Sequence, residues 1–372
     1  MDYEIEQKLR KITDAWDSLI IPYQFCKEKI NFEEQELTDY IVGIGGYFHD
    51  TFEIILEPRN YDGFAEMFSY YISYLQAIYI QQDLVIELLG LFNLENSKKV
   101  LNDNRNFSLN RNIRNELVGH PISRNSKKKY ELTSATMFSY VQAKDSIEYL
   151  QYHRKNDFKI EIVSYNISEI RNRHTEFLNY YFDKITEKIN EILKLHLVIL
   201  DDLLTNINSR AFSKIIDELS KYFELIFSFT YEFEKEKIKE IYNKQEEHRR
   251  YENMIDYFLY IVNFSLLEAK NQVISFIEKR EFLVVNRNEL IYKYDVSRNK
   301  EFHYELIKLS EINSNMHNFE FNSKIIRDRF PDDLDIKEEL DNMNINRNNI
   351  IEYYCSFELL NQLINKKTNN YT

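Results

Sequence analysis

The stretch Arg105–Lys129 reads RNFSLNRNIRNELVGHPISRNSKKK, and the rest of the fold can be argued outward from it. At its centre, Arg114 and Asn115 are followed by His120, which stands between Gly119 and Pro121. The chain contains only 6 Gly and 4 Pro among its 372 residues. A glycine and a proline on either side of one histidine therefore indicate a backbone geometry that matters locally.

Residues 110–118 carry Ile113, Leu117 and Val118 at helical spacing, which predicts a helix with one apolar stripe. We expect Gly119 to be a left-handed cap at the end of this helix, and Pro121 cannot continue it. On an unbroken helix, residues six apart would lie roughly 120° apart around the axis. A helix that ends at Gly119 can instead bring His120 back toward the face that carries Arg114.

A phosphodiester is the natural ligand for an arginine and a histidine placed together. The guanidinium of Arg114 offers a planar fork that matches phosphate oxygens, and His120 can accept or donate a proton near neutral pH. If the nucleophile is the 2′-hydroxyl of RNA, the reaction needs no metal and leaves a 2′,3′-cyclic phosphate and a 5′-hydroxyl. We therefore expect a metal-independent ribonuclease site, with no cofactor and no metal ligands.

The charge around this motif supports a polyanion site. Residues 95–129 hold nine basic and three acidic side chains, a net charge of +6, in a chain whose formal net charge is −13. A local basic region on an acidic protein indicates local contact with RNA. The predicted RNA-binding residues are Arg111, Arg124, Lys127, Lys128 and Lys129. For the three lysines alone, a solubilising loop is the simpler interpretation.

The bare pattern of Arg-Asn followed by His is weak, because Arg-Asn pairs are frequent in this chain. The pattern occurs a second time, at Arg298 and His303. That copy lies in a charged stretch without the glycine, the proline or the local basic excess. We interpret it as a solvated helix face.

At Arg114-Asn115 and His120 the sequence resembles the HEPN superfamily of all-α ribonucleases, whose signature is Arg, commonly a polar residue, and His after four to six positions. The resemblance covers at most residues 1–203. It implies Arg114 on the scissile phosphate, His120 in acid–base work and Asn115 as a polar support. It also implies a metal-independent endoribonuclease of the toxin–antitoxin or anti-phage type, a homodimer with a composite cleft, and an antitoxin or activator as partner.

Residues 65–94 predict a long buried helix, interrupted by the polar group Gln81-Gln82-Asp83 and by Glu87 one turn later. A charge on such a helix must be paired or reach water. We expect Asp83 or Glu87 to face Arg114 and orient it as a supporting residue. The alternative, weighed equally, is that this face is merely exposed.

After the motif the pattern changes to alternation of apolar and polar residues. Residues 136–141, 147–152 and 158–163 predict a small antiparallel β insert within about 134–164. Its tyrosines and His153 are available to stack on bases, although packing of the insert is favoured. Asn166-Ile-Ser-Glu169 is a capping-box pattern that opens a long helix to about Leu204.

The predicted fold class is mostly α: a HEPN-like helical bundle with a small antiparallel β insert over residues 1–205, then an all-α region over 206–372. In the second region we expect a strand or loop within 282–296, a turn or helix start at Pro331–Asp333 and a last helix over 348–365. It holds no catalytic constellation, so we expect a sensor or partner-binding role. Cys26 and Cys355 form no motif, and neither a signal peptide nor a membrane span is predicted, which favours the cytoplasm.

Two classes of function remain open. The first is the endoribonuclease with Arg114 and His120 at its centre. The second is a non-catalytic helical scaffold that binds RNA or protein. An exposed His120 beside Arg114 would favour the enzyme, and a His120 buried against apolar side chains would favour the scaffold.

Overall fold

A computed structural model describes residues 2–32, 40–56, 62–96, 98–124, 131–141, 145–207, 209–222, 235–278, 301–310 and 316–368. The chain divides into two compact units, one of Met1–Ile21 with Cys26–Lys194 and one of Pro22–Phe25 with Leu195–Thr372. The division falls inside a continuous helix, before the polar break near residue 205 that the sequence suggested. The candidate site lies in the first unit.

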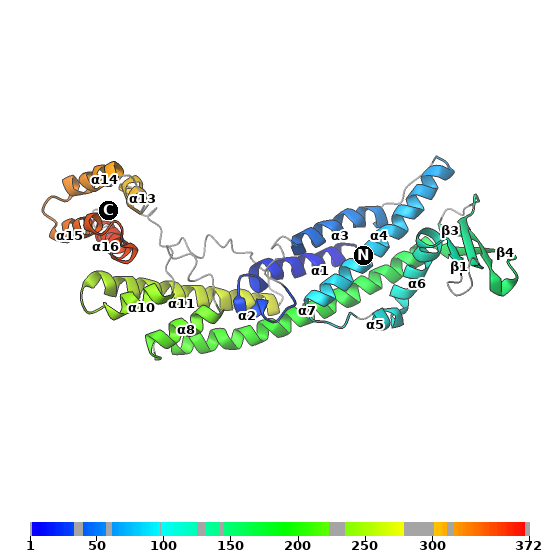
Figure 1. The fold of residues 1–372 in the computed structure, drawn as a ribbon, viewed down its shortest axis with the longest axis horizontal. Coiled ribbons are helices and arrows are strands. Elements are labelled where there is room, and N and C mark those ends of the chain that lie inside the picture. The colour runs from blue at the N-terminus through cyan, green and yellow to red at the C-terminus, as the bar shows by residue number, and fades with distance from the viewer. Residues whose placement is uncertain are drawn as a thin grey trace. The chain divides into compact units, whose positions relative to one another are not determined.

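The first unit is helical except for one sheet at the end of its helices (Figure 1). Its helices are α1 (Asp2–Ala15), η1 (Trp16–Ile20), α2 (Gln24–Lys27), α3 (Tyr40–Leu56), α4 (Phe64–Leu91), α5 (Lys98–Asp103), α6 (Arg105–Arg114), η2 (Asn115–Gly119) and α7 (Ile167–Asn206). The helical run of α1 and η1 does not continue into α2, because Pro22 can neither donate a backbone hydrogen bond nor fit inside a helix.

Two buried glutamines of α4 tie the other helices to it. The Gln81 amide donates to the Thr51 hydroxyl of α3 at 2.8 Å and accepts from His174 Nε2 of α7 at 2.7 Å. The Gln82 amide donates to the Phe107 carbonyl of α6 at 3.1 Å. Buried polar groups are stable only with such partners. The polar group predicted on this helix therefore holds α3, α6 and α7 around α4.

The β insert is confirmed as a four-stranded antiparallel sheet in the order β1-β2-β3-β4. Its strands are β1 (Ile122–Arg124), β2 (Leu132–Phe138), β3 (Ser146–His153) and β4 (Ile160–Asn166). β3 and β4 lie close to the predicted ranges 147–152 and 158–163, whereas β2 begins four residues before the predicted range 136–141 and ends three residues before its end. The sequence missed β1, because three residues after a proline are too short to show a period of two.

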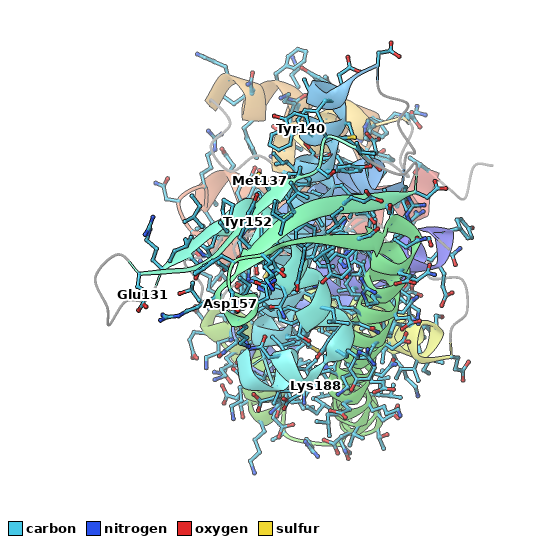
Figure 2. The ribbon with its side chains drawn as sticks, turned by 90° about the vertical axis from the view of Figure 1, so that its right-hand side faces the viewer. Glu131, Met137, Tyr140, Tyr152, Asp157 and Lys188 are labelled. Atoms are coloured by element: carbon cyan, nitrogen blue, oxygen red, sulfur yellow. The ribbon has the colours of Figure 1, made fainter. Side chains whose placement is uncertain are left out.

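The two faces of the sheet differ in environment. On the inner face, Phe138, Ile147 and Tyr149 join a core cluster that contains Tyr71 and Leu117. The register places the opposite rows, Met137-Leu150-Ile162 and Ala135-Tyr152-Ile160, on the outer face. Figure 2 looks onto this face, where Met137 and Tyr152 are labelled. Ile162 is 70% exposed.

The described elements of the second unit are all helices. Besides the end of α7 they are α8 (Phe212–Tyr222), α10 (Lys235–Asn243), α11 (Arg249–Ile277), α13 (His303–Ser310), α14 (Met316–Arg329), α15 (Leu334–Ile345) and α16 (Ile350–Thr368). The predicted helix start is confirmed, because the Asp333 carboxylate caps α15 by accepting from the Ile336 N–H at 3.1 Å. The strand or loop expected within 282–296 lies outside the described residues. No helix in the described part of the chain is long and apolar enough to cross a membrane.

Candidate active site

The motif lies where α6 changes into a wider turn. Asn104 caps the start of α6 by accepting from the N–H groups of Asn106 at 3.0 Å and Phe107 at 3.2 Å. After Arg114 the helix becomes the π-turn η2, which closes with the His120 N–H on the Asn115 carbonyl at 2.6 Å. Such π-turns are frequent at functional sites. The predicted helix end at Gly119 is confirmed.

The reason for a glycine at position 119 differs from the expected one. Among the described glycines only Gly63 has a positive φ, so Gly119 is not a left-handed cap. A Cβ atom placed on Gly119 would instead lie 2.6 Å from Nη1 of Arg114 and 3.5 Å from Oδ1 of Asn115. Glycine at this position therefore leaves space for the Arg114 guanidinium, which any other side chain would displace.

Arg114 is held by neutral groups. Its Nε and Nη2 donate to the Gln76 side-chain oxygen at 3.1 and 3.0 Å, and its Nη1 donates to Oδ1 of Asn115 at 3.2 Å. Its Cζ lies 4.0 Å from the centroid of the Tyr79 ring. A guanidinium has five N–H donors, so one on each terminal nitrogen remains for a ligand. With no carboxylate among these partners, the positive charge of Arg114 is not neutralised by them.

The expectation that Asp83 or Glu87 orients Arg114 directly is wrong. Asp83 accepts from Nη2 of Arg111 at 2.7 Å, and Glu87 accepts from the Tyr40 hydroxyl at 2.9 Å. The register between α4 and α6 explains the difference. From Arg111 to Arg114 the partner on α4 moves toward the N-terminus of that helix, from Asp83 to Gln76.

His120 is exposed and follows the π-turn with φ −139° and ψ 61°, outside both the helical and the extended regions. Its ring makes no hydrogen bond with any residue in the described part of the chain. The residue before it, Gly119, is the one on which the Arg114 guanidinium packs. The site thus combines a fixed cation and an exposed imidazole on adjoining stretches of backbone, which is consistent with the enzyme hypothesis.

The sheet fixes the backbone on both sides of His120. The Thr136 N–H of β2 donates to the Pro121 carbonyl at 2.8 Å, and the Thr136 hydroxyl donates to the Glu116 carbonyl. The Glu116 carboxylate accepts from the Tyr149 hydroxyl of β3 at 3.1 Å. Burial of Tyr149 and the neighbouring Glu116 charge raise the pKa of this phenol, so it remains a donor.

The predicted RNA-binding residues have different environments. Arg111 is committed to Asp83 and lies over Tyr79, and its Nη1 is buried. Its charge therefore acts within the protein. Arg124 is exposed at the end of β1. Lys127, Lys128 and Lys129 lie outside the described residues.

Gln76, Tyr79 and Thr136 are site residues that the sequence did not reveal. Gln76, Tyr79 and Asp83 lie three and seven positions apart on α4, which is the spacing of one helix face. A stripe of polar and aromatic residues on an otherwise apolar helix was the available signal. Thr136 gave none, because its contacts depend on the strand β1 that was missed.

A second cluster of titratable residues lies in the other unit, at His248, Glu338 and Glu339. Nδ1 of His248 accepts from the Arg250 N–H at 3.2 Å, so Nε2 carries the proton and donates to Glu338 at 3.1 Å. The Arg250 guanidinium bonds Glu339 at 3.0 and 3.1 Å and supplies the counter-charge. Metal binding through Nε2 would require the other tautomer and would break the helix cap. We interpret the cluster as structural.

Comparison with protein families, with curated proteins and with solved structures finds no match for this chain. The interpretation of the site therefore rests on its residues and their geometry.

Proposed function

We propose that the chain is a metal-independent endoribonuclease of the HEPN type. The observation that carries the proposal is the Arg114 guanidinium, packed on Gly119 beside the exposed His120, with two N–H donors left for a phosphate. In this proposal the substrate's 2′-hydroxyl attacks the adjacent phosphorus, the 5′-oxygen leaves, and a 2′,3′-cyclic phosphate results.

Each residue of the motif has a role in this reaction. Arg114 binds the non-bridging oxygens of the scissile phosphate and stabilises the charge that grows there. His120 carries the proton between the 2′-hydroxyl and the leaving oxygen. Asn115 fixes Nη1 of Arg114 from the side. Arg124 and the lysines at 127–129 add positive charge for the flanking phosphates.

The biological setting belongs to the proposal too. An RNA-cleaving chain of this type would act in the cytoplasm as a toxin or an anti-phage effector, controlled by an antitoxin or an activator. A homodimer would bring two Arg114/His120 sets to one composite cleft. The helical second unit would bind the controlling partner.

The first test is cleavage of end-labelled RNA in EDTA by wild type, His120→Ala and His49→Ala. His49 is an exposed histidine on α3, outside the motif, and serves as the matched control. We expect wild type and His49→Ala to leave 2′,3′-cyclic phosphate ends, and His120→Ala to lose at least about 100-fold in rate. Equal cleavage by all three would contradict the role of His120, and no cleavage by any would favour the scaffold.

The scaffold has one observation in its favour, which is the apolar outer face of the sheet. Met137 of β2 is 49% exposed, and Ile160 and Ile162 of β4 are 59% and 70% exposed. Leu150 and Tyr152 of β3 lie between them on the same face. Contiguous exposed apolar surface is typical of a protein-binding site. Under this second candidate function the chain binds a partner without cutting RNA, and all three proteins in the cleavage test remain inactive.

A further inference from the structure

The side of α4 that faces the motif presents one aromatic ring to two arginines. The Cζ atoms of Arg111 and Arg114 lie 3.9 and 4.0 Å from the centroid of the Tyr79 ring. Both distances are well within the range of cation–π attraction. Two like charges therefore contact the same ring.

Each arginine on the ring is fixed at its far end by a different residue of α4. Asp83 holds Nη2 of Arg111 at 2.7 Å, and Gln76 holds Nε and Nη2 of Arg114. The ring therefore lies in a row of contacts that runs from Asp83 through Arg111 and Tyr79 to Arg114. Asp83 reaches Arg114 only through this row.

The ring face, and not the hydroxyl, makes these contacts. In the described part of the chain the Tyr79 hydroxyl has no hydrogen-bond partner. A planar guanidinium over a ring face can slide, but it cannot tilt without losing the stacking contact. Gln76 and Asn115 hold the edge of the Arg114 guanidinium through hydrogen bonds, and the Tyr79 ring adds a contact with its face.

We propose that Tyr79 is a positioning residue for catalysis, which sets the plane in which Arg114 presents its two remaining N–H donors to the phosphate. The inference rests on the proposed ribonuclease function. It assigns the ring a role in the rate of the chemical step, because a misplaced guanidinium still attracts RNA but no longer matches the transition state.

The experiment compares Tyr79→Leu with Tyr79→Phe in the full chain. Tyr79→Leu removes the ring, and we expect kcat to fall about 10- to 100-fold with KM changed less than about threefold. Tyr79→Phe keeps the ring face, and we expect kcat within about threefold of wild type. Tyr47→Leu, at an exposed tyrosine of α3, is the control and should leave both constants unchanged.

A second readout does not depend on activity. In protein labelled with ¹⁵N-arginine, the Nε–H signals of Arg111 and Arg114 are assigned by the loss of one signal in Arg111→Lys and of the other in Arg114→Lys. Both signals should shift in Tyr79→Leu, which lacks the ring current, and stay in place in Tyr79→Phe. If Tyr79→Leu fails to fold, Asp83→Asn at the half-exposed end of the row replaces it, and it should shift both signals and lower kcat by a smaller factor.

The two readouts separate failure of this inference from failure of the proposed function. Unshifted arginine signals, or a kcat loss in Tyr79→Phe as large as in Tyr79→Leu, would overturn the inference even if RNA is cleaved. Absence of cleavage by wild type would instead contradict the ribonuclease, and with it any role of Tyr79 in a rate, whatever the arginine signals show.

Discussion

At the scale of residues, the site depends on the absence of a side chain at Gly119. Gly119 has no positive φ, so its backbone conformation suits alanine. Only the Arg114 guanidinium, 2.6 Å from the place of a Cβ atom, excludes a larger residue. Stability and function are therefore separable at this position.

Gly119→Ala should test this separation. We expect the free energy of unfolding to change by less than about 1 kcal/mol, because alanine is tolerated in a turn of helical handedness. We expect kcat/KM to fall about tenfold or more, since the methyl group displaces the Arg114 guanidinium from its position. Urea unfolding and RNA cleavage measure the two effects on the same preparation. A variant with full activity would show that Arg114 works from another position.

The residues proposed to carry the chemistry were easier to name from the sequence than the residues that hold them. Arg114, Asn115 and His120 lie within seven positions, and Gly119, Pro121 and the local basic excess mark them out. The partners of Arg114 depend on the register between α4 and α6, which the sequence does not encode locally. From charge, Asp83 was expected to pair with Arg114. The register between α4 and α6 places Arg111 next to Asp83 instead.

At the scale of elements, the sheet gives a direct test of register. Ile147 of β3 lies fully buried on the inner face, and Ile162 of β4 lies exposed on the outer face. Ile147→Ala should cost about 2–5 kcal/mol of unfolding free energy. Ile162→Ala should cost less than about 1 kcal/mol. Chemical denaturation of the two variants measures both, and equal losses would mean that β3 or β4 is shifted by one residue.

Elements with strong periodicity were predicted well. The short strand β1 and the division inside the continuous helix α7 were not predicted. The long helix α4 and the strands β3 and β4 follow from the pattern, whereas β2 was predicted three to four residues too far along the chain. The strand β1 does not follow from the pattern, because Thr136 and its backbone partners recruit it through tertiary contacts. The division of the chain inside α7 was also missed, because an unbroken amphipathic pattern gives no sign of where one core ends and another begins.

At the scale of the whole molecule, each unit contains one buried neutral histidine. Burial lowers the pKa of His174 to about 3 in the first unit and that of His196 to about 4 in the second. In the unfolded chain both would titrate near the ordinary value of 6.5. Below pH 6.5 the unfolded state therefore binds protons that the folded state does not, and each unit is destabilised.

We expect each histidine to remove up to about 1.4 kcal/mol of stability per pH unit between pH 6.5 and its folded pKa. Above pH 6.5 neither contributes to the pH dependence. Urea unfolding at pH 8, 6.5 and 5 measures the slope for wild type, His174→Gln and the exposed control His49→Gln. A reduced acid slope only in His174→Gln is the expected result, and parallel slopes in all three would contradict it.

The hydrogen bonds from Thr136 to the backbone at Glu116 and Pro121 have a consequence for the order in which the chain is made. Arg114 and His120 leave the ribosome before β2 does, so their backbone is first exposed without the strand that fixes it. If the chain is the ribonuclease proposed above, the ribosome that makes it is the nearest RNA. A site that is completed only when a later strand arrives would spare the nascent chain's own ribosome until the first unit is finished.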